Sequence, residues 1–339
     1  MKKQPMIRKT NLPLMRAAAV AMACLALPAG AAPADGYPSK PVQIVLGFPP
    51  GGSTDILARM VAQHLQQAWG QPVVVVNKPG ASTIIATESV ARATADGHTL
   101  LVGASSAMTI NPVLYKNLPY DAGRDFEPVA IMGSFPLVLA VQPSMKVKTV
   151  SELVASAKTE SLNYSSASTL FQLAGEMFKQ TAGVEVTHIP YKGSVQALTA
   201  LTTGDVQMLF LDPAPVITQM KAGKARALAV TSAHRWSLMP DVPTMTESGV
   251  PGYDFAGWIA LFTPNGTPPD IVAKVQREVA RIVELPDVKG KLETLGIDAG
   301  GRALGIGPAE NGPAALSRII QSEGERFAKV IRTANIKPE

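Results

Sequence analysis

The fold is decided by the stretch Gly47-Phe48-Pro49-Pro50-Gly51-Gly52-Ser53-Thr54-Asp55. It follows the apolar run 42–46 and precedes residues 56–65, whose apolar positions recur with helical spacing. This pattern predicts a buried strand, a tight turn and an amphipathic helix. The two prolines end the strand because they lack an N–H donor, and the two glycines permit the turn. The three residues that follow are expected to supply capping oxygens.

A helix that begins in this way leaves its first N–H groups without intrahelical partners. Together with the helix dipole, these groups form a site for an anion. We therefore expect this loop to hold a carboxylate or a phosphate. A well-capped turn without a ligand is the alternative, and repetition of the motif along the chain favours the ligand.

The first 34 residues have the composition of a secretory signal peptide. Five Lys and Arg residues precede the apolar run 17–27, and small residues follow up to Ala34. Eleven apolar residues are too few to span a bilayer as a helix, so the segment predicts export rather than a membrane anchor. We expect the mature protein in the periplasm.

Removing residues 1–34 changes the charge balance of the 339-residue chain. That segment holds five of the 31 Lys and Arg residues and none of the 26 Asp and Glu residues, so the remainder is neutral overall. A neutral chain gives no support to nucleic-acid binding, which needs a basic face. The only cysteine, Cys24, also lies in the signal segment, so the mature chain must be stable through its core without disulfides.

Strand-like and helix-like segments alternate through the rest of the chain. The strand-like segments include 73–77, 99–103, 186–189, 206–211 and 227–231. This alternation is typical of parallel βα units. The apolar segments 129–131 with 137–141, and later 257–262, predict two crossings between two lobes. The helices expected at 268–283 and 314–333 would return to the first lobe.

Five further turns resemble the first, at 77–83, 103–106, 165–169, 189–194 and 211–213. In open parallel sheets such helix starts lie at the carboxyl edge of the strands, where ligands bind. Two lobes that face each other would direct six starts into one cleft. No arginine occurs in these turns, so backbone N–H groups and hydroxyls must do most of the binding. The predicted ligand-binding residues are Phe48, Gly52, Ser53, Thr54, Asp55, Ser82, Thr83, Ser105, Ser106, Ser166, Ser168, Thr169, Lys192, Gly193, Ser194 and Asp212.

Catalytic and metal-binding motifs give no competing assignment. The chain has no Gly-x-Ser-x-Gly, Ser-x-x-Lys or His-Glu-x-x-His sequence, and the glycine loop lacks the Lys of a P-loop. Its four histidines are widely spaced, which argues against a metal site. We therefore predict no catalytic residues, no metal and no cofactor. Asp55 and Asp212 could form a carboxylate pair, but each is also explained as a helix cap.

Six short motifs occur along the chain: Tyr37-Pro38-Ser39-Lys40-Pro41, Phe48-Pro49-Pro50-Gly51-Gly52 with Asp55, Asp96-Gly97 with Thr99-Leu100-Leu101, Pro190-Tyr191-Lys192-Gly193, Pro240-Asp241-Val242-Pro243-Thr244 and Gly266-Thr267-Pro268. Together they resemble the Bug-type receptors, the substrate-binding proteins of tripartite tricarboxylate transporters. The resemblance extends over nearly the whole mature chain.

The resemblance implies an α/β type II periplasmic-binding-protein fold, with two lobes, a two-strand hinge and a ligand cleft. We expect lobe 1 to comprise 37–137 with 259–339, and lobe 2 to comprise 138–258. It also implies a small organic acid or amino acid as ligand, integral-membrane transporter subunits as partners, and a monomer. Where the family usually has a run of glycines, this chain has Ala81-Ser82-Thr83, and Ser166-Ala167-Ser168-Thr169 replaces a Gly-rich turn. These departures leave the identity of the acid open.

Two other functions remain possible at this stage. One is a secreted hydrolase or isomerase of small acids that uses Asp55 and a histidine. The other is a sensor whose closed, liganded form binds a signalling partner.

Overall fold

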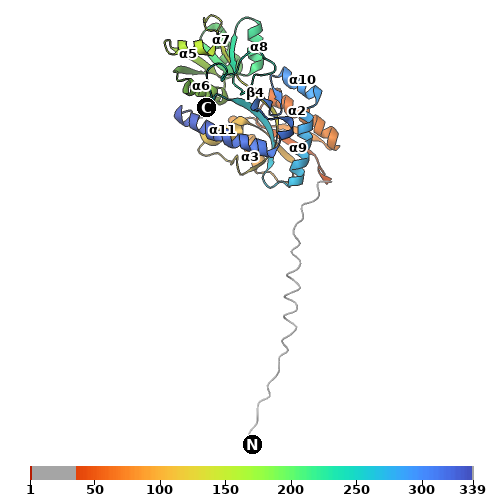
Figure 1. Cartoon of the computed structure of the whole chain (residues 1–339). Coiled ribbons are helices and arrows are strands. Elements are labelled where there is room, and N and C mark those ends of the chain that lie inside the picture. The colour runs from red at the N-terminus through yellow and green to blue at the C-terminus, as the bar shows by residue number, and fades with distance from the viewer. Residues whose placement is uncertain (2–35, 338–339) are drawn as a thin grey trace.

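The computed structural model describes Met1 and residues 36–337 of the chain. The predicted signal peptide, including Cys24, lies outside the described residues. Two α/β lobes pack side by side, each around its own sheet (Figure 1). Among residues 36–337, no helix combines the length and the apolar character needed to cross a membrane.

The first lobe contains a six-stranded sheet in the order β11-β4-β10-β3-β1-β2. Its strands are β1 (Val42–Leu46), β2 (Val73–Asn77), β3 (Thr99–Ala104), β4 (Phe126–Pro136), β10 (Ala256–Pro264) and β11 (Asp298–Ala299). Its α-helices are α2 (Ser53–Trp69), α3 (Ile84–Ala91), α4 (Asn111–Leu114), α9 (Pro269–Val283) and α10 (Pro286–Thr294). The predicted strand, turn and helix around residues 42–65 are confirmed.

The second lobe contains a five-stranded sheet in the order β7-β6-β8-β5-β9. Its strands are β5 (Val138–Val141), β6 (Leu162–Ser166), β7 (Val186–Pro190), β8 (Met208–Leu211) and β9 (Arg226–Val230). Its helices are α5 (Val150–Ala157), α6 (Thr169–Ala182), α7 (Ser194–Thr203) and α8 (Pro213–Lys221). The predicted parallel pairing is confirmed for β1 with β2 and β3, and for β6 with β7 and β8.

The strands next to the two crossings pair antiparallel with their neighbours instead. β10 lies between β3 and β4, and β5 lies between β8 and β9. Antiparallel partners occur here because these strands enter each sheet from the opposite lobe.

A small hydrogen-bond network joins the two crossing segments. The hydroxyl of Thr231 accepts from the N–H of Leu137 at 2.7 Å and donates to the carbonyl of Phe255 at 2.6 Å. The backbone of Thr231 bonds to the same two residues, at 2.9 and 2.8 Å. All three residues are buried. One threonine therefore ties the outgoing chain to the returning chain between the lobes.

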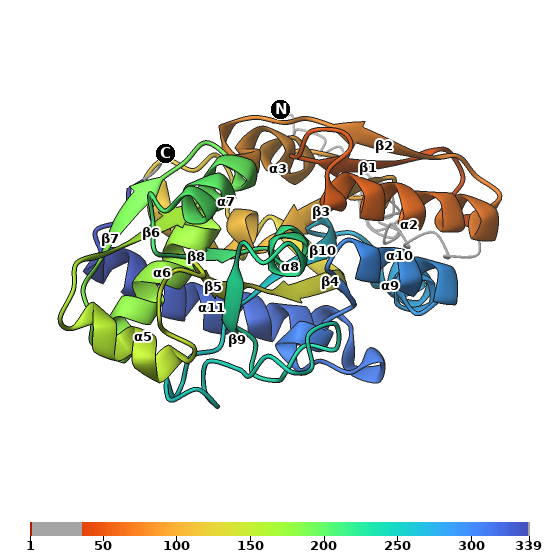
Figure 2. The same cartoon turned by 90° about the horizontal axis from the view of Figure 1, so that it is seen from above.

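The last helix, α11 (Pro313–Thr333), was expected to return to the first lobe, and it packs against the second lobe as well. Ala315 and Leu316 pack in a first-lobe core cluster with Trp258. Phe327 and Val330 pack in the core of the second lobe. In Figure 2 this helix runs along both lobes. It therefore forms a third connection between them, which no short-range sequence pattern could indicate.

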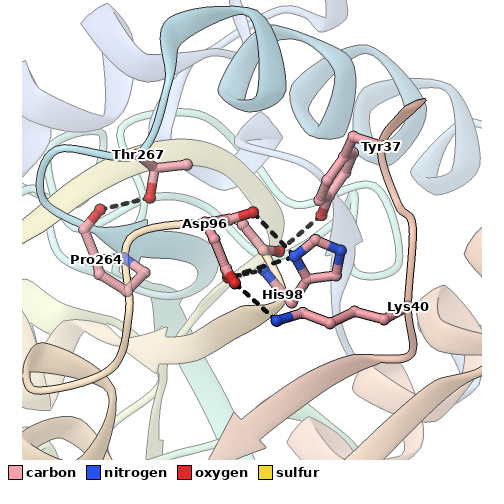
Figure 3. A network of polar contacts seen from close by, with 7 residues as sticks. Tyr37, Lys40, Asp96, His98, Pro264 and Thr267 are labelled. Atoms are coloured by element: carbon pink, nitrogen blue, oxygen red, sulfur yellow. Dashed lines mark hydrogen bonds and ion pairs between the residues drawn. The ribbon is translucent and has the colours of Figure 1, made fainter. Parts of the chain in front are cut away.

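Three of the family-like motifs meet at the amino ends of β1 and β3, whereas the glycine loop follows the carboxyl end of β1 (Figure 3). The Tyr37 hydroxyl donates to the carbonyl of Gly97 at 2.7 Å, and Lys40 pairs with Asp96 at 2.9 Å. The Thr267 hydroxyl donates to the carbonyl of Pro264 at 2.7 Å beside them. Residues 37–40 and 96–98 precede β1 and β3, so this network fixes the amino ends of those strands.

Candidate functional site

A cavity of about 420 Å³ lies between the lobes, at the carboxyl ends of their strands. This volume is at the small end of the range for ligand pockets, about 300–1,000 Å³. Five of the six predicted turns line it. The predicted residues found in its wall are Phe48, Ser53, Thr54, Ser82, Thr83, Ser105, Ser106, Ser168, Thr169 and Asp212.

The remaining predicted residues are Gly52, Asp55, Ser166, Lys192, Gly193 and Ser194, and these do not line the cavity. The last three belong to the turn before α7, where Lys192 is exposed. Ser166 ends β6 with only 1% of its surface exposed, and its hydroxyl lies 2.6 Å from Nε2 of His188. Its side chain is therefore used within the second lobe.

The glycine loop presents backbone donors at the start of α2. Ile56 makes the first intrahelical bond, to the carbonyl of Gly52, so the N–H groups of Ser53 and Thr54 precede it. Gly51 adopts φ +88°, a left-handed conformation that favours glycine. The residue that caps this helix is Gly52, and no side chain caps it. The prediction that Ser53, Thr54 and Asp55 supply capping oxygens to the helix is therefore wrong.

Asp55 instead stabilises the loop through the hydrogen bonds that its carboxylate accepts. Its carboxylate accepts hydrogen bonds from Gly51 N–H at 2.9 Å, Arg59 Nε at 2.9 Å and Asn77 Nδ2 at 2.8 Å. Burial acts to raise the pKa of Asp55, which is only 2% exposed, but these hydrogen bonds outweigh it and lower the pKa to about 2. Asn77 also donates to the carbonyl of Phe48 at 3.0 Å, which links the loop to β2.

The second loop is strained where the family-like glycine run is replaced. Ala81, Ser82 and Thr83 adopt φ angles of 45°, 50° and 73°, in the left-handed region. Non-glycine residues rarely occupy this region, and a β-branched one such as threonine is a clear outlier. Asn111 Nδ2 donates to the carbonyl of Ser82 at 2.9 Å, and the hydroxyl of Tyr115 donates to Ser82 Oγ at 3.0 Å. These contacts hold the loop in its strained shape.

Thr83 is packed closely against the first loop. A Cβ at Gly47 would lie 2.6 Å from Cβ of Thr83, so only glycine fits there. The Thr83 hydroxyl is buried and has no hydrogen-bond partner among the described residues. A buried hydroxyl without a partner is costly, so this loop carries a desolvation penalty in addition to its backbone strain.

The third predicted turn has a different local structure. Ser106–Ile110 forms a π-helical turn that continues into α4, rather than the α-helix start that the sequence predicts. The hydroxyl of Thr109 donates to the carbonyl of Ser105 at 2.6 Å. Ser105 and Ser106 nevertheless lie in the cavity wall.

In the second lobe, α6 and α8 direct their amino ends to the cavity. Ser168 caps α6, and the N–H groups of Thr169 and Leu170 precede the first bond back to its carbonyl. Asp212 occupies the capping position of α8 as predicted, with Pro213 first in the helix, but its side chain makes no capping hydrogen bond. Burial raises the pKa of Asp212 to about 6.

Apolar side chains form most of the rest of the wall, together with Asn111 and Tyr115, and the sequence analysis did not identify any of these as site residues. They come from distant parts of the chain and include Phe135, Leu170, Phe171, Trp258 and Ile297. Phe135 and Trp258 lie in the paired strands β4 and β10, next to the crossings between the lobes. Their position beside a crossing is a signal for these two aromatic residues, whereas no local pattern marks the other three.

Groups proposed for catalysis do not meet in the cavity. Neither Asp55 nor any of the four histidines, all within residues 36–337, lines it. His64 lies 3.2 Å from Asp287 on the surface, and His98 contacts Asp96. Within the same residues, no three His, Cys, Asp or Glu side chains are grouped as metal ligands.

Comparison with known proteins assigns the family. Residues 57–336 match the family described as the tripartite tricarboxylate transporter family receptor. BugT of Bordetella pertussis is 34% identical over 323 residues, which cover 94% of this chain and 95% of BugT.

Among solved structures, an R. palustris protein with adipate is 34% identical with a TM-score of 0.74, covering 89% of this chain and 100% of that one. MatC from Rhodopseudomonas palustris, with bound malate, is 31% identical with a TM-score of 0.71, covering 87% and 100%. The periplasmic binding protein BugD is 30% identical with a TM-score of 0.71, covering 89% and 100%. The chain belongs to the receptor family of the tripartite tricarboxylate transporters.

Proposed function

We propose that this protein is a periplasmic solute receptor that binds one carboxylate group of a small organic acid or amino acid between its lobes. The observation that carries the proposal is the convergence of several turns with free N–H groups and hydroxyls on one cavity. Each helix start contributes on the order of 0.3–1 kcal/mol toward a negative charge, and more when water is excluded. The malate and adipate bound by relatives support a carboxylate ligand.

Ligand binding closes the two lobes in this proposal. We assign residues 37–137 with 259–339 to lobe 1 and residues 138–258 to lobe 2, with the end of α11 also packing in the core of lobe 2. Closure removes water from the cavity, and the weak attraction of the helix starts becomes sufficient to hold the carboxylate. The monomeric, liganded receptor then delivers the acid to integral-membrane transporter subunits, as the family assignment supports.

A thermal-shift screen of organic acids and amino acids tests the proposal. A ligand that binds only the folded state stabilises it by about 2.7 kcal/mol at a hundredfold excess over Kd. We expect at least one small acid to raise the melting temperature. Thr169→Trp, in the cavity wall, should abolish that rise, whereas Thr199→Trp on the exposed face of α7 should preserve it.

The absence of any shift across the acids would contradict the proposal. Delivery to a transporter is tested separately, by deleting the membrane subunits. Loss of uptake with unchanged binding supports a transport receptor, whereas unchanged uptake of the bound acid contradicts it.

A further inference from the structure

The charge in the cavity wall is unusual for a site that binds acids. No Lys, Arg or His residue of the described chain lines the cavity, and Asp212 is its only ionisable carboxylate. A second carboxylate on the ligand would therefore find no cationic partner in the wall. Near Asp212 it would be repelled, because like charges interact strongly where water is scarce.

Asp212 also lacks the partners that a structural acid has. It makes no hydrogen bond or ion pair with any described residue, and its side chain does not cap α8. Asp55 provides the contrast, because three protein donors saturate its carboxylate outside the cavity. The two carboxylates that the sequence suggested as a pair thus have different roles. Asp55 stabilises a loop, and Asp212 offers unused acceptors to whatever occupies the cavity.

The helix that follows Asp212 differs from the other helix starts. Pro213 and Pro215 carry no N–H, so the first turn of α8 offers fewer donors than the first turn of α2 or α6. Ala214 packs against the first lobe, where a Cβ at Gly296 would lie 3.2 Å from its nitrogen. This wall therefore combines an acidic side chain with a scarcity of donors, which does not favour an anion.

We propose that the preferred ligand is an acid that also carries a protonated amine. Its carboxylate binds to the N–H groups and hydroxyls of the turns before α2, α3 and α6, and its ammonium group binds to Asp212. This inference rests on the proposed function and narrows its ligand class. An ammonium group is complementary to Asp212, because a charge-assisted hydrogen bond then replaces the water lost from the carboxylate.

Calorimetry at neutral pH with three series of linear acids tests the inference. The far end of the chain is an ammonium group in one series, a second carboxylate in another and a methyl group in the third. Acids of the same chain length are compared across the three series. We expect the amino acids to bind about 10- to 100-fold more tightly than the methyl-ended acids, as hydrogen bonds to charged groups imply. L-α-amino acids are included to vary the position of the amine.

Asp212→Asn should remove the advantage of the amine and raise the affinity for dicarboxylates. The matched control is Asp270→Asn, an exposed acid in the first turn of α9, which should leave all affinities unchanged. If Asp212→Asn unfolds, Asp212→Ser also removes the charge with a small polar side chain and serves the same purpose.

Two results would overturn the inference while leaving the proposed function intact. One is tightest binding of the dicarboxylates by the unchanged protein. The other is an amine preference that survives in the Asp212 variants. Failure of all three series to bind would instead reject the proposed function, and the inference with it.

Discussion

Replacing Thr83 by glycine should stabilise the protein, against the usual effect of introducing a glycine. Thr83 adopts φ 73° at the start of α3, and its buried hydroxyl has no partner among the described residues. The substitution removes both features. It also removes a side chain that lies close to Gly47.

The magnitude follows from four contributions. A left-handed conformation costs a non-glycine residue about 1–2 kcal/mol, and a buried unpaired hydroxyl costs about 1–3 kcal/mol. Against this, glycine loses about 0.5–1 kcal/mol through backbone entropy, and the lost methyl group costs about 0.8 kcal/mol. We expect the free energy of unfolding of Thr83→Gly to rise by about 2 kcal/mol, because the central values of the two gains sum to about 3.5 kcal/mol and those of the two losses to about 1.5 kcal/mol.

Urea unfolding of the ligand-free protein measures the change. Thr218→Gly is the control, because Thr218 is exposed in the interior of α8, where the helix is right-handed. That variant should lose up to about 1 kcal/mol. A loss of similar size in Thr83→Gly would refute the reasoning, because it would mean that the loop stores no strain at this residue.

Three further predictions concern the site and its supports. Ser82→Gly combined with Thr83→Gly should admit bulkier acids while the need for a carboxylate persists, and an unchanged ligand ranking in a thermal-shift screen would contradict this. Because the pKa of Asp55 is lowered from 3.8 to about 2, its contribution to stability is present above pH 3.8 and is lost as the pH falls to about 2. Asp55→Asn should therefore be less stable at neutral pH and should show a flatter acid decline in urea unfolding; parallel declines would exclude this role. Burial raises the pKa of Glu323 from 4.5 to about 8, so the protein should lose stability as the pH rises from 4.5 to about 8. Glu323→Gln still accepts a hydrogen bond from Trp258 Nε1 and should remove that loss. The measurement is urea unfolding across that range, and an equal loss in the variant would count against the assignment.

The sequence predicted the features that depend on neighbouring residues. The strand, turn and helix at 42–69 follow from apolar spacing and from two prolines and two glycines. The six helix starts were found in the same way, and five reach the cavity because parallel strands end at one edge of a sheet.

Features that depend on distant contacts could not be predicted. Asp55 was interpreted as a cap or a ligand contact because its bond from Asn77, 22 residues further along the chain, cannot be read from a local pattern. The i,i+4 spacing to Arg59 was visible in the sequence, but it alone did not distinguish these roles. The turn before α7 looked equivalent to the others, yet it lies outside the cavity wall. The apolar wall around Trp258 is assembled from segments more than a hundred residues apart, so no periodicity marks it.

The path of α11 constrains the lobe closure proposed above. Its amino-terminal half packs in one core cluster with Trp258 and its carboxy-terminal half in another with Phe178 and Phe255, so the helix is part of both lobes. Between these anchors, Glu323 accepts a hydrogen bond from Trp258 at 2.8 Å. A rotation about the long axis of α11 would preserve most of these contacts, whereas a swing perpendicular to it would pull one half of the helix out of its core. The lobe closure proposed above would therefore be favoured as a rotation about this helix, although none of its residues lines the cavity.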